Sequence, residues 1–203
     1  MLNITNEDNM NLMSRYPDNY FDLAIVDPPY KNDVSGLKVG YNKLQDRSDF
    51  SFNHFKQPQK KYFDELFRVS KNQIMWGFNY YLELLPNTDS VIVWNKHQNG
   101  HFSECELAWS SVKKTRIFDY AFGKDLYNKI HPTQKPVALY KWLLTNYAKE
   151  GDKILDTHLG SGSIAIACHD YGFDLTACEL DKEYFDKAMQ RINNHTAQIK
   201  MFQ

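Results

Sequence analysis

The chain has 203 residues, 42% of them hydrophobic and 15% aromatic, which suits one globular domain with a full core. It contains no apolar run of the ~18 residues that span a membrane and no signal-like N-terminus, so we expect a cytoplasmic protein without membrane partners. The cysteines, Cys105, Cys168 and Cys178, are too scattered for a disulfide framework or a zinc site.

The formal net charge is −1, but the charges are unevenly distributed along the chain. Residues 31–61 contain seven Lys/Arg against three Asp, and residues 110–135 contain six against two. Residues 150–189 reverse the balance, with nine acidic against three basic residues. Such a chain can present a positive face to nucleic-acid phosphates, although solvated loops would explain the same pattern.

The first half of the chain predicts short strands and helices, with one long irregular segment. Strands are expected at 2–5, 21–26, 73–76, 90–94 and 103–111, the last antiparallel to its neighbour. Helices are expected at 62–69 and about 80–85, and a short helix or a turn at 9–16. Residues 31–60 lack periodicity and are long for a loop, which is typical of a functional or mobile segment.

The second half alternates strands and helices more regularly. The clearest helix, 136–150, has Pro136 in its first turn and Gly151 after its end. Strands are expected at 153–156 and 174–179, and helices at 163–170 and 182–194. This alternation predicts an α/β fold, a doubly wound and mainly parallel Rossmann-like sheet.

The sequence Asp27-Pro28-Pro29-Tyr30 directly follows the strand predicted at 21–26. Because proline has no N–H to donate, the chain must leave the sheet here as a stiff loop. The loop offers a carboxylate, a carbonyl and an aromatic ring, which together suit a planar base with an exocyclic amine. An ordinary strand-ending turn remains the alternative.

A glycine-rich turn lies between the strand at 153–156 and the helix at 163–170. Gly160 and Gly162 let the backbone approach a ligand closely. Glu179 ends the next strand, 19 positions after Gly160, where it can accept the hydroxyls of a ribose. Because the glycines also fit the dinucleotide fingerprint, a nicotinamide-dependent dehydrogenase and a structural turn both stay open.

The third motif is His131-Pro132-Thr133-Gln134-Lys135-Pro136, just before the clearest helix. A helix start beside a threonine hydroxyl and a lysine ammonium can bind a carboxylate. A cofactor with an amino-acid tail requires such a site, whereas a dehydrogenase has no evident use for it.

In this order, the three motifs resemble those of the S-adenosylmethionine-dependent DNA amino-methyltransferases. They are most similar to the permuted β group, in which D-P-P-Y precedes the glycine-rich motif, and the resemblance covers nearly the whole chain. It implies a sheet order of 2–5, 174–179, 153–156, 21–26 and then the remaining strands. The two ends of the chain would then build one cofactor pocket.

The resemblance also implies roles for particular residues. The implied catalytic residues are Asp27, Pro28, Pro29 and Tyr30. The implied cofactor residues are Asp8, His131, Thr133, Lys135, Asp156, His158, Gly160, Ser161, Gly162 and Glu179. Asp8 would bind the adenine amino group of the cofactor, Glu179 would bind its ribose, and His158 replaces the family's aromatic residue.

The implied reaction is methyl transfer to the N6 amine of a flipped adenine in DNA, as in restriction–modification systems. Asp27 in the first motif position favours adenine, but cytosine-N4 and RNA amino-methyltransferases remain alternatives. Methylation at cytosine C5 uses a Pro-Cys nucleophile, and the chain has no Pro-Cys pair. A non-catalytic, methyltransferase-like nucleic-acid-binding subunit is a further alternative, which the intact Asp27, Tyr30 and Lys135 disfavour.

Larger relatives carry a separate target-recognition region where this chain has only residues 112–130. We therefore expect a single methyltransferase domain, 1–203, whose DNA contacts come from 31–61, from 112–130 or from the second subunit of a homodimer. Short or relaxed sequence specificity would follow. We expect no metal site, because His97 and His101 flank Gly100 without a nearby third ligand.

Overall fold

The computed structural model describes residues 1–30, 57–98, 103–122 and 129–198. Most of the candidate DNA-contacting range 31–61 therefore lies outside the described residues, as do 123–128 of the second range and His101.

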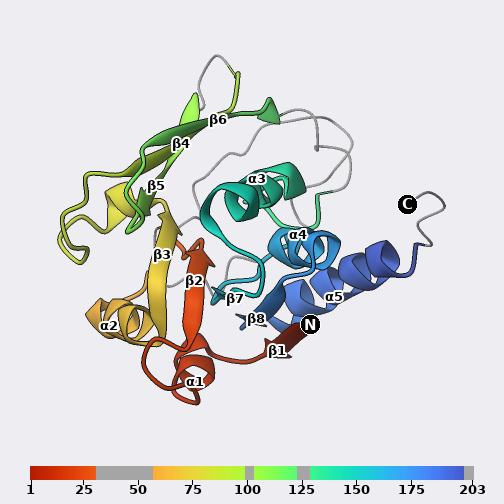
Figure 1. Ribbon diagram of the computed structural model, residues 1–203. Helices are drawn as coiled ribbons and strands as arrows, with labels where there is room; N and C mark the ends of the chain where they lie inside the picture. The colour runs from red at the N-terminus through yellow and green to blue at the C-terminus, as the bar shows by residue number, and fades with distance from the viewer. Residues whose placement is uncertain (31–56, 99–102, 123–128, 199–203) are drawn as a thin grey trace.

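A mixed sheet of eight strands runs through the described chain in the order β1-β8-β7-β2-β3-β5-β4-β6 (Figure 1). The strands are β1 Leu2–Asn6, β2 Phe21–Val26, β3 Ser70–Trp76, β4 Val91–Asn95, β5 Cys105–Ser110, β6 Arg116–Asp119, β7 Lys153–Asp156 and β8 Asp174–Glu179. Five neighbouring strands, β1, β8, β7, β2 and β3, are parallel to one another. Strand β5 is antiparallel to β3 and β4, and β6 is parallel to β4. The predicted strand order and the doubly wound Rossmann-like fold are confirmed.

The N-terminal and C-terminal parts of the chain meet in adjacent strands. In the register of β1 against β8, Leu2 pairs with Leu175 and Asn6 pairs with Glu179. Both strands end at the same edge of the sheet, where β2 leads into Asp27 and β7 into Thr157. Ligands of open parallel sheets bind at this carboxyl edge, so the permuted order collects all the motifs there.

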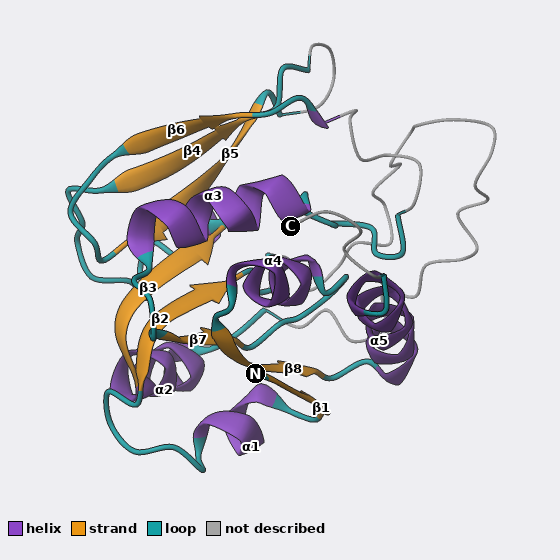
Figure 2. Ribbon diagram, turned by 45° about the vertical axis from the view of Figure 1, so that its right-hand side comes forward, coloured by secondary structure: helices purple, strands orange, loops and turns teal. Residues whose placement is uncertain are grey.

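Helices cover both faces of the sheet (Figure 2). They are α1 Asn9–Met13, α2 Lys60–Val69, α3 Val137–Tyr147, α4 Ser163–Tyr171 and α5 Lys182–Thr196. One apolar core lies between the sheet and α3, α4 and α5, and a second lies between the sheet and α1 and α2. Strand β2 is buried on both faces: Leu23 and Ile25 belong to the first core, and Ala24 and Val26 to the second.

Two sequence predictions were wrong about local structure. The helix predicted at 80–85 is a short 3₁₀ helix, Phe78–Tyr80, followed by turns, because the chain turns at Gly77 in the left-handed region and reaches Pro86 soon afterwards. Strand β6 was missed inside the candidate loop 112–130. It is a short edge strand in which Phe118 is buried and Ile117 is 61% exposed, so its apolar signal is weak.

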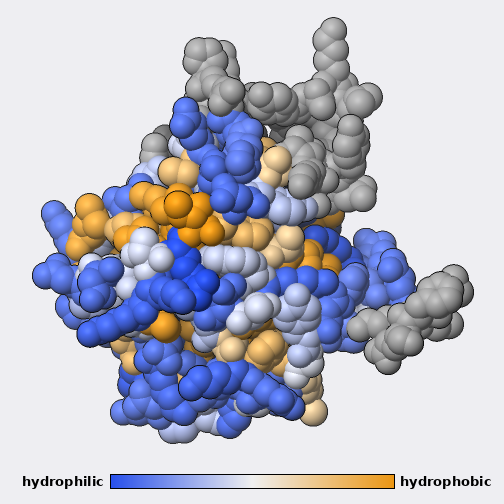
Figure 3. Space-filling model, turned by 45° about the horizontal axis from the view of Figure 1, so that its top comes forward, coloured by the Kyte–Doolittle hydropathy of each residue, from blue (hydrophilic) through white to orange (hydrophobic). Residues whose placement is uncertain are grey.

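The tryptophans Trp76, Trp94 and Trp109 are all buried, and the three cysteines are unpaired thiols. None of the helices in the described ranges is long and apolar enough to cross a membrane. Hydrophilic side chains predominate on the face shown in Figure 3, with hydrophobic ones gathered in patches between them. Two large, exposed apolar side chains, Tyr80 and Leu180, lie at a cavity described below.

Candidate active site

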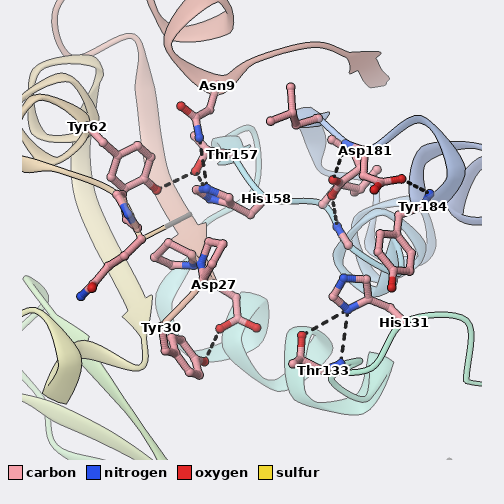
Figure 4. A pocket seen from close by; sticks show the side chains of 18 of the residues that line it. Asn9, Asp27, Tyr30, Tyr62, His131, Thr133, Thr157, His158, Asp181 and Tyr184 are labelled. Atoms are coloured by element: carbon pink, nitrogen blue, oxygen red, sulfur yellow. Dashed lines mark hydrogen bonds between the residues drawn. The ribbon is translucent and has the colours of Figure 1, made fainter. Parts of the chain in front are cut away.

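A cavity of about 600 Å³ lies at the carboxyl edge of the parallel strands. Its lining combines the segments that follow β1, β2, β7 and β8 with the segment before α3. Asp27 and Tyr30 lie on one side of the cavity, and Asp181 and Tyr184 lie across from them (Figure 4). This size is typical of small-molecule and cofactor sites.

The Asp27 carboxylate is held by two other motif residues. The Tyr30 hydroxyl donates to Asp27 Oδ1, and the Lys135 ammonium donates to Oδ2. Lys135 also lies 3.3 Å from the Tyr30 hydroxyl and 3.2 Å from Glu106 Oε2. Its side chain is only 3% exposed, so the fold joins the first and third motifs, 108 positions apart, in one buried ion pair.

The electrostatics of this end of the cavity are dominated by burial. Burial raises the pKa of Asp27 and the nearby Glu106 carboxylate adds to this, although Lys135 opposes it. Burial also opposes the charge on Lys135, but Asp27 and Glu106 together raise the pKa of that ammonium above its usual value. The raised pKa makes the Asp27 carboxylate a better proton acceptor than an exposed aspartate, and its partner Lys135 is held in the charged form by the two carboxylates.

The proline loop and the Tyr30 ring are positioned by the segment after β3, which the sequence did not single out. The Tyr81 hydroxyl donates to the Pro29 carbonyl and lies 3.3 Å from the Pro28 carbonyl. The Tyr30 ring stacks on Tyr80, with centroids 5.1 Å apart and planes within 6°. A Cβ on Gly77 would lie 2.0 Å from the Tyr30 ring, so only glycine fits beneath it.

The glycine-rich turn is fixed by backbone hydrogen bonds to the buried Asp156 carboxylate and the half-buried Glu179 carboxylate. Gly160 N–H donates to Glu179 Oε2 at 2.9 Å, and Asp181 N–H donates to Oε1 at 3.0 Å. His158 N–H donates to Asp156 Oδ1 at 2.9 Å. The carboxylates at the ends of β7 and β8 therefore fix the shape of the glycine-rich turn.

Two predicted cofactor residues, Asp156 and Gly162, do not line the cavity. Asp156 is 2% exposed, and burial raises its pKa to about 8. Gly162 has a φ of 74° at the start of α4, and a Cβ there would lie 2.8 Å from the Ile192 side chain. Both residues shape the turn and its packing, a distinction that the motif alone does not reveal.

His158 lines the cavity with a ring that is held at both nitrogens (Figure 4). Its Nε2 lies 3.1 Å from Asn9 Nδ2, and its Nδ1 lies 3.0 Å from Thr157 Oγ1. The ring also meets the edge of Tyr62, whose hydroxyl is 2.7 Å from Thr157 Oγ1. Burial lowers the pKa of His158 to about 3, so this wall of the cavity is neutral.

His131 forms a second neutral wall on the opposite side. Its Nδ1 accepts from Thr133 N–H at 3.3 Å and lies 3.1 Å from Thr133 Oγ1, and its ring meets Tyr184 at 4.5 Å. Burial, with help from Lys135, lowers the pKa of His131 to about 3. The two side chains predicted to bind a carboxylate together therefore have different partners: the Thr133 hydroxyl contacts His131, and the Lys135 ammonium contacts Asp27.

Acidic residues reach the cavity where the chain ends meet. Asp8 Oδ1 accepts from Met10 N–H at 2.9 Å and caps α1, and Asp8 also lines the cavity. Asp181 caps α5 in the same way and lies beside Glu179. Asp181 and Tyr184 were not predicted, because they belong to no motif. The described part of the chain holds no cluster of three or more metal-ligating side chains.

Three comparisons with known proteins found proteins that are similar to this chain. The family model N6_N4_Mtase, a DNA methylase, matches residues 88–190, just over half of the chain. The Type II methyltransferase M.HpaI of Haemophilus parainfluenzae is 23% identical over 223 residues, which cover 87% of this chain and 69% of that protein.

Two solved structures show the same fold. The M1.HpyAVI–SAM complex is 19% identical with a TM-score of 0.65, over 95% of this chain and 100% of that one. The PvuII DNA methyltransferase, described as cytosine-N4-specific, is 10% identical with a TM-score of 0.67, over 100% and 88%. The family match excludes the dehydrogenase alternative. The predicted cofactor, S-adenosylmethionine, is confirmed. The chain belongs to the N6_N4_Mtase family of DNA methylases.

Proposed function

We propose that this protein is a DNA adenine-N6 methyltransferase that acts on the exocyclic amine of a flipped adenine. The observation that carries the proposal is the buried Asp27 carboxylate, fixed by Lys135 and Tyr30 at the wall of a cavity that the cofactor turn also lines. Asp27, Pro28, Pro29 and Tyr30 form the proposed catalytic loop.

The amine nitrogen is a poor nucleophile, because its lone pair is delocalised into the purine ring. In the proposed mechanism, Asp27 and the Pro28 carbonyl accept its two hydrogens and favour a pyramidal nitrogen with a free lone pair. Each oxygen keeps acceptor capacity beyond its present partner, since carboxylate and carbonyl oxygens carry two lone pairs. Most of the rate enhancement then comes from positioning and electrostatics.

When bound, S-adenosylmethionine supplies a methyl group whose bond to sulfur breaks with its electron pair left on the sulfur. The target nitrogen then carries one proton too many, and Asp27 is the nearest proposed acceptor. Its raised pKa favours this role. In this proposal the flipped base stacks on the Tyr30 ring, whose other stacking partner is Tyr80, and this offsets part of the cost of unstacking the base.

The cavity suits a nucleoside cofactor in size and chemistry. In our proposal Asp8 binds the adenine amino group and Glu179 the ribose hydroxyls, beside the backbone of Gly160 and Ser161. The Glu179 oxygens each accept one backbone N–H and retain a lone pair for a hydroxyl. His131, Thr133 and His158 complete the proposed cofactor walls, Asp156 and Gly162 shape the turn, and Lys135 acts through Asp27.

DNA is the proposed macromolecular substrate. Of the basic range 31–61, residues 57–61 fall in the described chain, and Lys61 lines the cavity. This position supports a contact to the DNA backbone from that range. A homodimer, a single-domain organisation and a short target sequence stay predictions, which gel filtration and methylation of defined duplexes would test.

The test of the proposed function is methyl transfer from labelled S-adenosylmethionine to DNA, followed by nucleoside analysis. We expect labelled N6-methyladenine. Labelled N4-methylcytosine would instead support the cytosine alternative, which the fold of the PvuII enzyme keeps relevant. Label in RNA alone, or no transfer by a protein that binds nucleic acid, would contradict the proposal.

A further inference from the structure

Beneath the catalytic loop, four charged side chains form an alternating row of carboxylates and ammonium groups. Lys135 Nζ contacts Asp27 Oδ2 and lies 3.2 Å from Glu106 Oε2, and Lys96 Nζ lies 3.4 Å from Glu106 Oε1. The two lysine side chains are only 3% and 9% exposed. The row joins the loop after β2, strand β5, the end of β4 and the segment before α3.

The row is electrically balanced, but Lys135 is shared between two carboxylates. The Asp27 and Glu106 side chains are 14% and 28% exposed. Holding four largely covered charges together is costly, and ion pairs of this kind do not by themselves stabilise a fold. A hydrophobic contact could join the same elements at lower cost. Two members of the row, Asp27 and Lys135, line the cavity, and perturbed charges at a cavity wall are typical of functional sites.

Glu106 is the member that competes with Asp27 for the same ammonium. Lys135 and Lys96 hold the pKa of Glu106 below its usual value even though burial opposes this, so Glu106 is ionised at neutral pH. Its negative charge also adds to burial in raising the pKa of Asp27. Glu106 therefore weakens the hold of Lys135 on Asp27 through charge.

We propose that Glu106 is a positioning residue that shares the Lys135 ammonium with Asp27 and so keeps Asp27 a strong acceptor for the target amine. Lys96 is the second partner of Glu106 and moderates this sharing. The inference deepens the proposed function and rests on it for the identity of the amine, but the effect of Glu106 on Asp27 can be measured without turnover.

Other charged groups near the row do not change the direction in which Glu106 is expected to shift the pKa of Asp27. Among the described residues, the other titratable or charged groups that interact with Asp27, Glu106 or Lys135 are Tyr30, Tyr81, Lys96, Lys129, His131, Tyr140 and Asp156. They are present equally in the wild type and in a variant that changes Glu106 alone. Differences between variants therefore isolate the charge that was removed.

The two variants of the row are predicted to shift the pKa of Asp27 in opposite directions. In Glu106→Gln, Asp27 loses a repulsive neighbour and keeps Lys135 to itself, so its pKa falls. In Lys96→Met, Glu106 turns more fully to Lys135 and a positive charge is lost, so the pKa of Asp27 rises. Glu104→Gln is the matched control, because Glu104 is exposed just before β5.

The experiment measures the Asp27 carboxyl carbon by NMR titration in the whole protein, and the pH dependence of kcat/KM for methyl transfer. We expect the Asp27 titration and the acid limb of kcat/KM to move down by about one pH unit in Glu106→Gln and up in Lys96→Met, with Glu104→Gln unchanged. At pH 7, Glu106→Gln should lose about tenfold in kcat, with the KM for S-adenosylmethionine within about twofold.

Shifts of the same sign in the two variants, or an Asp27 titration that Glu106→Gln leaves in place, would overturn the inference. If the wild type transfers no methyl group to DNA, the proposed function fails, and the NMR titration alone still decides whether Glu106 acts on Asp27. A purely structural role for Glu106 would lower stability without opposite shifts in the two variants.

Discussion

The two ends of the cavity are held in place by different kinds of interaction. At the proposed catalytic end, Asp27 is fixed by charged and hydroxyl side chains, chiefly Lys135 and Tyr30. At the proposed cofactor end, the turn around Gly160 is fixed by its own backbone, which donates to Glu179 and Asp156. The neutral rings of His131 and His158 flank the cofactor end.

This difference predicts that substitutions at the two ends of the cavity affect different properties of the protein. Side-chain charges set the acceptor strength at the catalytic end, so substitutions there should change the rate of the chemical step. Backbone geometry sets the shape of the cofactor end, so substitutions there should change stability and cofactor affinity. One residue at each end, Gly77 and Gly162, has no room for a Cβ, which allows the contrast to be tested with the same substitution.

The largest effect is expected for Gly77→Ala. The added Cβ would lie 2.0 Å from the Tyr30 ring, so Tyr30 must leave its place beside Asp27. We expect about a hundredfold loss in kcat, which is typical when a reacting group is misplaced by an ångström. Single-turnover methyl transfer measures the rate of the chemical step, and cofactor titration measures the affinity for S-adenosylmethionine, which should stay within about threefold of the wild type.

Gly172→Ala is the matched control, because Gly172 has a φ of 75° but nothing within 4 Å of a Cβ. It imposes the same backbone strain without a clash and should leave kcat unchanged. Equal losses of activity in both variants would mean that strain alone, and not displacement of Tyr30, explains the effect.

The next effect concerns the neutral walls of the cofactor end. Because the pKa of His131 is lowered to about 3, the folded state binds fewer protons than the unfolded state between about pH 3 and 6.5. The stability contributed by this histidine is present above its unfolded pKa and is lost as the pH falls. Between pH 7 and 5 the loss should be about 1 to 2 kcal/mol.

Urea denaturation of the wild type and His131→Asn at both pH values isolates this contribution, since Asp156 and other groups titrate alike in the two proteins. The variant should lose less stability than the wild type as the pH falls. The control His169→Asn changes an exposed histidine on α4 and should behave as the wild type does. An unchanged pH slope in His131→Asn would show that this ring is protonated in the folded protein.

The smallest effect is expected for Gly162→Ala. Its Cβ would lie 2.8 Å from Ile192 Cδ1, the end of a flexible side chain, so the neighbour can partly give way. We expect the free energy of unfolding to fall by about 1 to 2 kcal/mol more than in the control Gly151→Ala, which has open space around it.

Ile192→Val removes the clashing methyl group and should restore most of that difference when it is combined with Gly162→Ala. If the double variant loses as much free energy of unfolding as Gly162→Ala alone, the destabilisation comes from backbone strain at Gly162 and not from its contact with α5. A kcat reduced as strongly as in Gly77→Ala would remove the contrast between the two ends.

Much of the fold and of the site was predictable from the sequence, because each motif is contiguous and lies at the end of a strand or the start of a helix. The order of motifs predicted that β1 would lie beside β8, and the fold confirms it. Local signals were insufficient where structure depends on distant packing. Strand β6 is weakly apolar and forms only because β4 offers it an edge.

The residues that the sequence did not reveal act through strand register or long-range contact. Glu106 reaches the site because β5 pairs antiparallel with β4, which sets it opposite Trp94. Tyr81 reaches the proline loop from a turn that was predicted as a helix. Lys135 looked like a ligand for a cofactor carboxylate because its motif precedes a helix, whereas its actual partner, Asp27, lies 108 positions away.

The central claim is that Asp27 is the acceptor for the amine that is methylated. Its most direct test compares methyl transfer to DNA by the wild type, Asp27→Ala and the exposed control Asp64→Ala, with cofactor binding followed by calorimetry. We predict that Asp27→Ala loses at least about a thousandfold in kcat while it binds S-adenosylmethionine within about threefold of the wild type. Full methylation by Asp27→Ala would contradict the account.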